Sequence, residues 1–432
     1  MIEIAERFRS PDAVKAAVLD PKNCNPDPLY DRLPAMWDDL SLTAGFPGIL
    51  LLMAELQPVD PNGGWDATAH LYVLKIRDAI ETQGRISCAM HGGLAGVCFA
   101  LLQASHNRTR YQRLLEKLED HLIASVETSY FLPLHHNLDH ALPSSPFIYD
   151  LISGITGIGL YGLICLEQER FVRFSEEIVR LLIRLAQGLK VGERSVPGWY
   201  LPSEMQFLEE DRRQYPQGNF NLGLAHGIPG VLGFLALALE KGICLDGQKE
   251  AIESISHWLQ KKQKKLCWPG KISWEEEISG ELKSYSSRDA WCYGTPGVAS
   301  ALYFAGKVLK NKAWIDQALF AMRSVYDRSP EEWGLFSPTF CHGLSGLLLM
   351  SHLMAKREGD AKLQSHVKEL QARVWDFYRP ETPFGFPDFE RTKKGGYASL
   401  NKAGVLEGGA GVLLTLLAVE RNSSHWYYPF LI

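Results

Sequence analysis

The sequence predicts an all-α protein, an α/α toroid in which seven inner helices alternate with seven outer helices. Three observations support this prediction. A Gly-x-x-Gly motif occurs seven times, an aliphatic run follows each motif, and amphipathic segments lie between the runs. Self-similarity at intervals of several tens of residues is typical of stacked supersecondary units, and the spacing here suits two helices plus a variable loop per unit. An open helical solenoid stays the alternative to a closed toroid.

The seven motifs share one phase relative to the aliphatic runs. They begin at Gly45, Gly93, Gly154, Gly227, Gly294, Gly343 and Gly408. Pro47, Pro229 and Pro296 occupy the same motif position, and proline is tolerated there because the first helical turn leaves its N–H groups unpaired. The glycines are expected to allow close backbone approach and to supply turn geometry. Each motif therefore predicts the start of an inner helix.

The aliphatic runs and the segments between them differ in the distribution of apolar residues. The run 230–239 reads Gly-Val-Leu-Gly-Phe-Leu-Ala-Leu-Ala-Leu, and a helix that is apolar on every face is buried on every face. Segments 110–127, 176–189 and 363–378 are amphipathic. They predict outer helices with one face toward the inner ring and one toward water.

The helical pattern predicts one toroid domain over residues 38–432, after an N-terminal segment 1–37. Loop insertions are expected near 131–149, 190–224 and 266–290, as small irregular or β elements. The second and third insertions contain tryptophans and short alternating runs, which favour strands. Because the inner helices should begin at one end of the toroid, unpaired N–H groups and function are expected at that mouth.

Composition is ordinary for a water-soluble protein. The chain has 432 residues with 46% hydrophobic and 22% charged side chains, a formal net charge of −5 and a pI of about 6.2, and nothing indicates nucleic-acid binding. Charges throughout the first 20 residues argue against a signal peptide. The eight cysteines show no disulfide framework. We expect a reduced, cytoplasmic protein, with peripheral contact at the inner face of the membrane left open.

Cys341 and His342 directly precede the sixth motif, and Cys292 holds the place of Cys341 before the fifth. Thiolate sulfur and imidazole nitrogen are zinc ligands, and catalytic zinc sites keep three protein ligands plus one exchangeable position. A lone buried cysteine more often packs as a small hydrophobe. The matching places in consecutive repeats favour a site for one zinc ion with Cys292, Cys341 and His342 as ligands.

Four further residues are candidates for chemistry. His226 stands before its motif as His342 does, either as an acid/base group or as a structural imidazole. Asp150 precedes the third inner helix, as a helix cap or as a carboxylate that orients His226. Arg288 is either half of an exposed ion pair with the aspartate beside it or a cation directed at developing negative charge. Tyr293 either donates a hydrogen bond or packs.

Three segments together resemble a known family. Residues 288–294 (Arg-Asp-Ala-Trp-Cys-Tyr-Gly), 341–343 (Cys-His-Gly) and 224–227 (Leu-Ala-His-Gly), with the seven motifs, are similar to lanthipeptide (lantibiotic) cyclases of the LanC-like type, in particular the stand-alone class I enzymes. The resemblance extends from about residue 38 to the C-terminus. It implies a zinc-containing toroid that adds cysteine thiols to dehydroalanine or dehydrobutyrine within a leader-bearing precursor peptide. A dehydratase and an exporter are the implied partners.

The resemblance also implies roles for individual residues. They are zinc binding for Cys292, Cys341 and His342, acid/base catalysis for His226, and positions around the acid/base residue for Asp150, Arg288 and Tyr293. The chemistry agrees, because a free thiol has a pKa of about 8.5 and zinc deprotonates a coordinating thiol. Arg288 would stabilise the enolate formed by thiolate attack. Whether His226 protonates the α-carbon or deprotonates the thiol stays open.

Two other functions stay open on the sequence alone. One is zinc-activated alkylation of a thiol with a different electrophile, as in prenyl transfer or glutathione addition. The other is a helical-repeat binding scaffold in which zinc is structural. A structural site is closed by four protein ligands, so it would require a fourth ligand from Cys267, His91 or His226.

Overall fold

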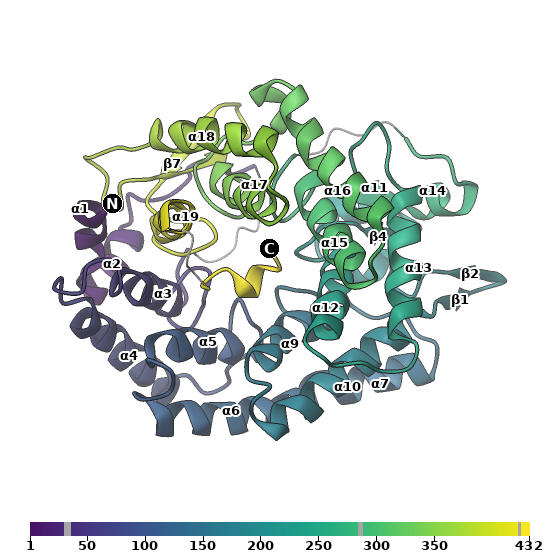
Figure 1. The fold of residues 1–432 in the computed structure, drawn as a ribbon, viewed down its shortest axis with the longest axis horizontal. Coiled ribbons are helices and arrows are strands. Elements are labelled where there is room, and N and C mark those ends of the chain that lie inside the picture. The colour runs from purple at the N-terminus through teal and green to yellow at the C-terminus, as the bar shows by residue number, and fades with distance from the viewer. Residues whose placement is uncertain (30–35, 284–287, 422–424) are drawn as a thin grey trace. The chain divides into compact units, whose positions relative to one another are not determined.

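A computed structural model describes residues 1–29, 36–283, 288–421 and 425–432. Residues 30–35 of the predicted N-terminal segment and residues 284–287 of the third predicted insertion lie outside these ranges. The chain forms two compact units. Unit 1 comprises Met1–Asp120 and Leu335–Tyr427, and unit 2 comprises His121–Gly334 and Tyr428–Ile432. Figure 1 shows the labelled elements along the chain.

Each of the seven motifs begins an inner helix, as predicted. These helices are α3 (Phe46–Leu56), α5 (Leu94–Ala104), α9 (Ile155–Ile164), α12 (Ile228–Glu240), α15 (Thr295–Val308), α17 (Leu344–Glu358) and α19 (Gly409–Arg421). Their apolar faces are covered all round. In α9, for example, every residue from Ile155 to Leu163 is buried, as expected of a helix without a polar face.

A second set of helices is amphipathic. It consists of α4 (Trp65–Thr82), α6 (Gln112–Val126), α10 (Glu169–Ala186), α13 (Gln248–Lys261), α16 (Lys312–Ser324) and α18 (Ala361–Trp375). The three predicted outer segments correspond to α6, α10 and α18, of which α10 begins earlier than expected. In α10, Phe171 and Ile178 are buried whereas Glu169 and Arg173 are exposed, so this helix presents one face to the inner helices and one to water.

In unit 1 the inner helices α17, α19, α3 and α5 pack in that order, with α18 against α17 and α4 against α3 (Figure 1). The N-terminal segment forms α1 (Ile2–Ala5), η1 (Glu6–Phe8) and α2 (Pro11–Val18). The α2 helix packs against α4, and the Tyr72 hydroxyl donates to the Phe8 carbonyl at 2.6 Å. The Phe8 ring also lies beside Gly409 at the start of α19. In unit 1 the N-terminal segment thus covers the inner helix of the last repeat.

In unit 2 the inner helices α9, α12 and α15 pack in that order, with α10, α13 and α16 against them respectively. Residues 428–432 complete this core. They include the short turn η6 (Tyr428–Phe430), which packs against α9. The Trp291 indole donates to the Phe430 carbonyl at 2.8 Å, and the Leu431 side chain lies beside Gly233 of α12.

The second and third predicted insertions contain strands, as expected. Strands β1 (Leu189–Val191) and β2 (Arg194–Val196) form a hairpin, and β3 (Tyr200–Leu201), β4 (Asn219–Asn221) and β5 (Lys271–Ser273) form an antiparallel sheet in the order β3-β4-β5. Short helical elements flank them: η3 (Ser203–Met205), α11 (Glu209–Gln214) and α14 (Trp274–Ser279). The central strand of this sheet, β4, therefore ends shortly before α12 begins.

Two segments differ from the sequence-based expectation. The stretch 131–149, expected as an irregular loop, continues from the π-helical turn η2 (Glu127–Phe131) into α7 (Leu132–Asp139) and then α8 (Pro146–Tyr149). Pro133 and Pro146 lie in the first turns of α7 and α8, where the missing N–H of proline is tolerated, and Pro143 lies between the two helices. Unit 1 also contains an unpredicted hairpin of β6 (Asp388–Arg391) and β7 (Tyr397–Leu400), and short turns η4 (Val325–Asp327) and η5 (Pro330–Trp333) lie in unit 2.

Close backbone approach explains the glycines of the motif. A Cβ atom on Gly230 would lie 2.6 Å from the carbonyl oxygen of Leu224, and one on Gly411 would lie 1.8 Å from that of Val405. Both carbonyls belong to the loop that leads into the helix. Positive φ, the other expected reason, applies to Gly294 at 108° but not to Gly93 at −175°.

The same loops satisfy the first N–H groups of the helices. At the start of α5, the N–H groups of Leu94 and Ala95 donate to the carbonyls of Ser87 and Cys88 at 2.8 and 3.3 Å. The first N–H of α17 donates to Ser337 at 2.9 Å, and that of α19 to the Lys402 carbonyl at 3.0 Å. The expectation of unpaired N–H groups is therefore wrong for these starts, because loop carbonyls occupy them.

None of the helices in the described ranges is long and apolar enough to span a bilayer.

Two glycines of α12 provide a matched test of this packing. Gly230→Ala would place a methyl group against the Leu224 backbone, whereas Gly233→Ala would meet only the Leu431 side chain, at 3.4 Å. We expect Gly230→Ala to lower the free energy of unfolding by at least about 1–3 kcal/mol. Gly233→Ala should leave it unchanged or raise it by up to about 1 kcal/mol, since alanine is the better helix former. Urea denaturation followed by circular dichroism measures both, and equal effects would refute the close-approach explanation.

Candidate active site

Backbone hydrogen bonds join the loops that precede the inner helices of unit 2. The N–H of Leu151 donates to the carbonyl of Ala225 at 3.2 Å, and the N–H of Ala225 donates to the carbonyl of Cys292 at 3.3 Å. These loops lead into α9, α12 and α15. The neighbouring residues Asp150 and His226 are two of the predicted site residues, so the connected loops hold them together with Cys292.

His226 and Asp150 make the central side-chain contact of unit 2. The His226 Nδ1 lies 2.6 Å from the Asp150 Oδ2, with Asp150 fully buried and 35% of the His226 side chain exposed. An ionised carboxylate can only accept, so Nδ1–H donates and Nε2 is left as the nitrogen that can take up or release a proton. The other oxygen of Asp150 accepts from the N–H groups of Ser153 and Gly154 at 2.7 and 2.9 Å. One side chain thus holds both the imidazole and the turn that leads into α9.

Tyr293 lies close to His226, with 6.5 Å between the ring centroids. Its hydroxyl accepts a hydrogen bond from the Asn221 Nδ2 at 2.9 Å, and the Asn221 Oδ1 accepts from the N–H of Gly223 at 2.8 Å. Burial raises the pKa of Tyr293 above its usual range, although the Asn221 hydrogen bond opposes the shift. The hydroxyl therefore stays protonated at neutral pH and keeps its hydrogen for donation.

Arg288 and Asp289 do not match the simplest expectation from the sequence. Asp289 is buried, and its Oδ2 lies 2.7 Å from the Arg328 Nη1. Burial raises the pKa of Asp289, and the Arg328 guanidinium counteracts that shift. The expectation of an exposed ion pair between Arg288 and Asp289 is therefore wrong for Asp289, which is buried and paired with Arg328. Arg288 itself is partly buried, and its Cβ lies beside Gly334.

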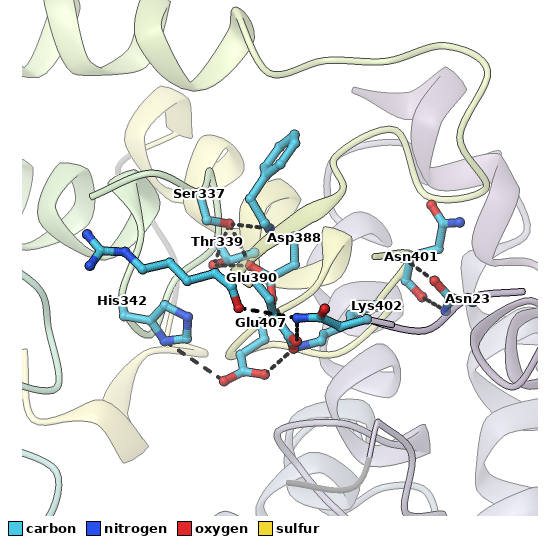
Figure 2. A network of polar contacts seen from close by, with 12 residues as sticks. Asn23, Ser337, Thr339, His342, Asp388, Glu390, Asn401, Lys402 and Glu407 are labelled. Atoms are coloured by element: carbon cyan, nitrogen blue, oxygen red, sulfur yellow. Dashed lines mark hydrogen bonds and ion pairs between the residues drawn. The ribbon is translucent and has the colours of Figure 1, made fainter. Parts of the chain in front are cut away.

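Cys341 and His342 lie in unit 1, in the loop before α17. The N–H of Cys341 donates to the Leu406 carbonyl at 2.8 Å, and the His342 Nδ1 lies 3.9 Å from the Glu407 Oε1 (Figure 2). The His342 side chain is 19% exposed. His91, also in unit 1, is buried, and its backbone carbonyl accepts from Ser41 and Thr43.

The predicted zinc ligands are divided between the units, with Cys341 and His342 in unit 1 and Cys292 in unit 2. Within the described ranges no three His, Cys, Asp or Glu side chains are grouped so as to hold a metal ion. The types of donor nevertheless fit zinc. All eight cysteines are described and none is in a disulfide, and the Nδ1 of His342 faces a carboxylate, as in zinc sites where the other ring nitrogen binds the metal. The three-ligand site stays a prediction.

Five polar residues near the candidate groups were not identified from the sequence. They are Asn221, Asp388, Glu390, Lys402 and Glu407. Asn221 stands shortly before His226 in the sequence, and this proximity could have marked it as a candidate site residue. The other four come from the β6–β7 hairpin and the loop after it, a segment in which neither periodicity nor motif spacing indicated an element.

The chain is similar to proteins of known function over almost all of its length. It is 26% identical over 423 residues to the nisin biosynthesis protein NisC of Lactococcus lactis subsp. lactis, which covers 92% of this chain and 93% of that protein. Its structure matches a solved structure of nisin cyclase with a TM-score of 0.77 and 26% identity, covering 91% of this chain and 92% of that one. Nisin cyclase is an α/α toroid, so the likeness confirms the predicted fold class.

The family resemblance seen in the sequence is also confirmed. The sequence model of the family described as lanthionine synthetase C-like protein matches residues 36–431, and this protein therefore belongs to that family.

Proposed function

We propose that this protein is a zinc-dependent lanthionine synthetase. Its substrate would be a dehydrated, leader-bearing precursor peptide, in which it adds cysteine thiols to dehydroalanine or dehydrobutyrine to form the thioether rings of a lantibiotic. The observation that carries the proposal is the His226–Asp150 pair, in loops hydrogen-bonded to the loop of Cys292. Family membership and the similarity to nisin cyclase support the same reaction.

The proposed reaction balances without an oxidant or a leaving group. The substrate thiol loses its proton, and sulfur forms a C–S bond to the β-carbon of the dehydro residue. The electron pair of the C=C bond moves onto the adjacent carbonyl as an enolate. Protonation of the α-carbon then restores the carbonyl, so that the thiol hydrogen is replaced by a new C–H bond and no atom is lost.

His226 is the residue proposed to move the proton. Its Nδ1–H is directed at Asp150, so Nε2 is the nitrogen that would deliver a proton to the α-carbon. The Asp150 carboxylate, 2.6 Å from Nδ1, holds the ring in the orientation from which Nε2 would act. General acid catalysis of this kind contributes about 10²–10⁴-fold to a rate.

Tyr293 and Arg288 are proposed to act on the enolate. The Tyr293 hydroxyl is neutral, since burial raises its pKa, and it accepts from Asn221. Its own hydrogen could therefore be donated to a developing oxyanion. A positive charge from Arg288 would stabilise the same oxygen, because fixed donors and charges act most strongly where charge develops in the transition state.

Cys292, Cys341 and His342 are the residues proposed to hold zinc, which would supply the deprotonation of a coordinating substrate thiol. Thiolate and imidazole donors suit this metal. We further propose a cytoplasmic enzyme that works in an assembly with a dehydratase and an exporter, in peripheral contact with the inner face of the membrane.

The proposed metal ligands can be tested with two cysteine variants. Wild-type protein should contain about one zinc per chain, the single catalytic ion expected of such a site. Cys341→Ala should lose most of it and fail to cyclise dehydrated peptide. Cys244→Ala, which alters an exposed cysteine, is the control and should keep both properties. Elemental analysis measures zinc, and alkylation of unreacted thiols followed by mass spectrometry measures ring closure. Zinc-free wild type, or full zinc and activity in Cys341→Ala, would contradict the proposal.

The acid/base role of His226 predicts a separation of metal binding from catalysis. His226→Asn should keep zinc at the wild-type level but slow ring closure by about 10²–10⁴-fold. Single-turnover cyclisation of a dehydrated peptide at saturating enzyme gives the rate. Wild-type kinetics in this variant would remove His226 from the mechanism.

Asp150 is expected to act through His226. Asp150→Asn keeps an oxygen that can accept from the N–H groups of Ser153 and Gly154, but its amide can donate to Nδ1 and favour the imidazole tautomer with hydrogen on Nε2. A comparable substitution in a Ser-His-Asp triad reduces kcat by about 10⁴-fold for this reason. The double variant with His226→Asn should be no slower than His226→Asn alone, whereas multiplied rate losses would show independent action.

A further inference from the structure

We propose that Glu407, held in place by the buried Lys402, positions His342 for metal binding. The inference rests on the proposed zinc ligands and concerns a residue that contributes no bond to the metal itself. Glu407 lies at the end of the loop that leads into α19, and His342 lies in the loop that leads into α17. Both belong to unit 1.

Lys402 is the anchor of this arrangement. Its ammonium lies 2.9 Å from the Asp388 Oδ2, 2.7 Å from the Glu390 Oε1 and 2.7 Å from the Glu407 Oε2 (Figure 2). The Lys402 side chain is only 9% exposed, so a partner must offset the cost of burying its charge. Burial alone would lower the pKa of Lys402, but the three carboxylates raise it, so the ammonium stays charged.

The two oxygens of Glu407 face different partners. One binds Lys402 at 2.7 Å, and the other lies 3.9 Å from the His342 Nδ1. Of the three carboxylates around Lys402, Glu407 is therefore the one that joins the ammonium to the imidazole (Figure 2). A carboxylate opposite one ring nitrogen fixes the tautomer and ring orientation, and it makes the other nitrogen a better metal ligand.

The same network fixes the backbone next to both proposed ligands of unit 1. The Ser337 hydroxyl donates to the Asp388 Oδ1 at 2.6 Å, which ties the loop before α17 to the hairpin residue bound by Lys402. On the other side, the Leu406 carbonyl accepts from the N–H of Cys341 at 2.8 Å. The residue that follows Leu406 is Glu407, so side-chain and backbone contacts hold the two loops at the same place.

The charges in the network are not balanced. One ammonium faces three carboxylates, of which Asp388 is completely buried. A single carboxylate would neutralise Lys402, and each additional buried anion costs solvation energy. The network therefore carries surplus negative charge on the side that faces His342.

Matched variants of the carboxylates test the proposal on the full-length protein. Glu407→Gln removes the charge opposite His342 and leaves Lys402 with two carboxylates. Glu390→Gln removes a carboxylate at the same 2.7 Å distance from Lys402 but not the one that faces His342. Zinc affinity is measured by competition with a chromophoric chelator. The ligand-field spectrum of the Co²⁺-substituted protein reports the geometry of the metal site, and thermal unfolding without metal reports folding.

We expect Glu407→Gln to weaken zinc binding by about 10- to 100-fold and Glu390→Gln to leave it within about threefold of wild type. The Co²⁺ spectrum should change in Glu407→Gln only, with similar metal-free unfolding temperatures for the two variants. Equal losses in both variants, or unchanged affinity in Glu407→Gln, would overturn the inference. If Cys341→Ala still abolishes zinc binding in that case, the proposed function stands, whereas zinc-free wild-type protein would refute the proposed function itself.

Discussion

Hydrogen bonds from one motif loop to the next are the constraint on which the rest of this structure depends. In unit 1 they run from Cys341 to Leu406, from Leu406 to Thr43 and from Thr43 to His91, and in unit 2 from Ala225 to Cys292. All six residues stand two positions before the first glycine of a motif. Since buried backbone groups must find partners, this position is defined by its main chain, and its side chain can vary. The same scaffold can therefore present a thiol in one repeat and a packing residue in another.

The two histidines that precede motif glycines have similar surroundings, because each imidazole faces a carboxylate. His226 and His342 each stand directly before a motif glycine, and each has its Nδ1 opposite a carboxylate from the loop of a different motif. In both cases the second oxygen of the carboxylate has another task. The second oxygen of Asp150 accepts from the turn before α9, and that of Glu407 binds Lys402. The surroundings of each imidazole are thus tied to the folding of a neighbouring loop. At His226 the 2.6 Å hydrogen bond to Asp150 also selects one tautomer.

Much of the fold was predictable because its periodic part is simple. Glycine phase located all seven inner helices, and apolar periodicity located α6, α10 and α18. Segment 131–149 has no motif that marks its helices, and the hairpin β6–β7 has no repeat that marks it. The contact between Asp150 and His226 was one of two alternatives that the sequence left open for Asp150, and the structure shows it. Lys402 and Glu407 could not be predicted, since charged residues near a hairpin are usually solvated, and only the tertiary structure shows that Lys402 is buried and that Glu407 binds it.

Residues 428–432 belong to unit 2. They are separated in sequence from the rest of that unit, which ends at Gly334, by residues 335–427 of unit 1. During synthesis on the ribosome, α9, α12 and α15 emerge long before Phe430 and Leu431, which pack against them. Leu431 cannot pack beside Gly233, and Phe430 cannot accept from the indole N–H of Trp291, until residues 335–427 have been translated. Unit 2 cannot reach its final packing on its own, and Trp291 directly precedes Cys292. The loop that carries this cysteine would therefore be fixed only after residues 335–427 have been translated.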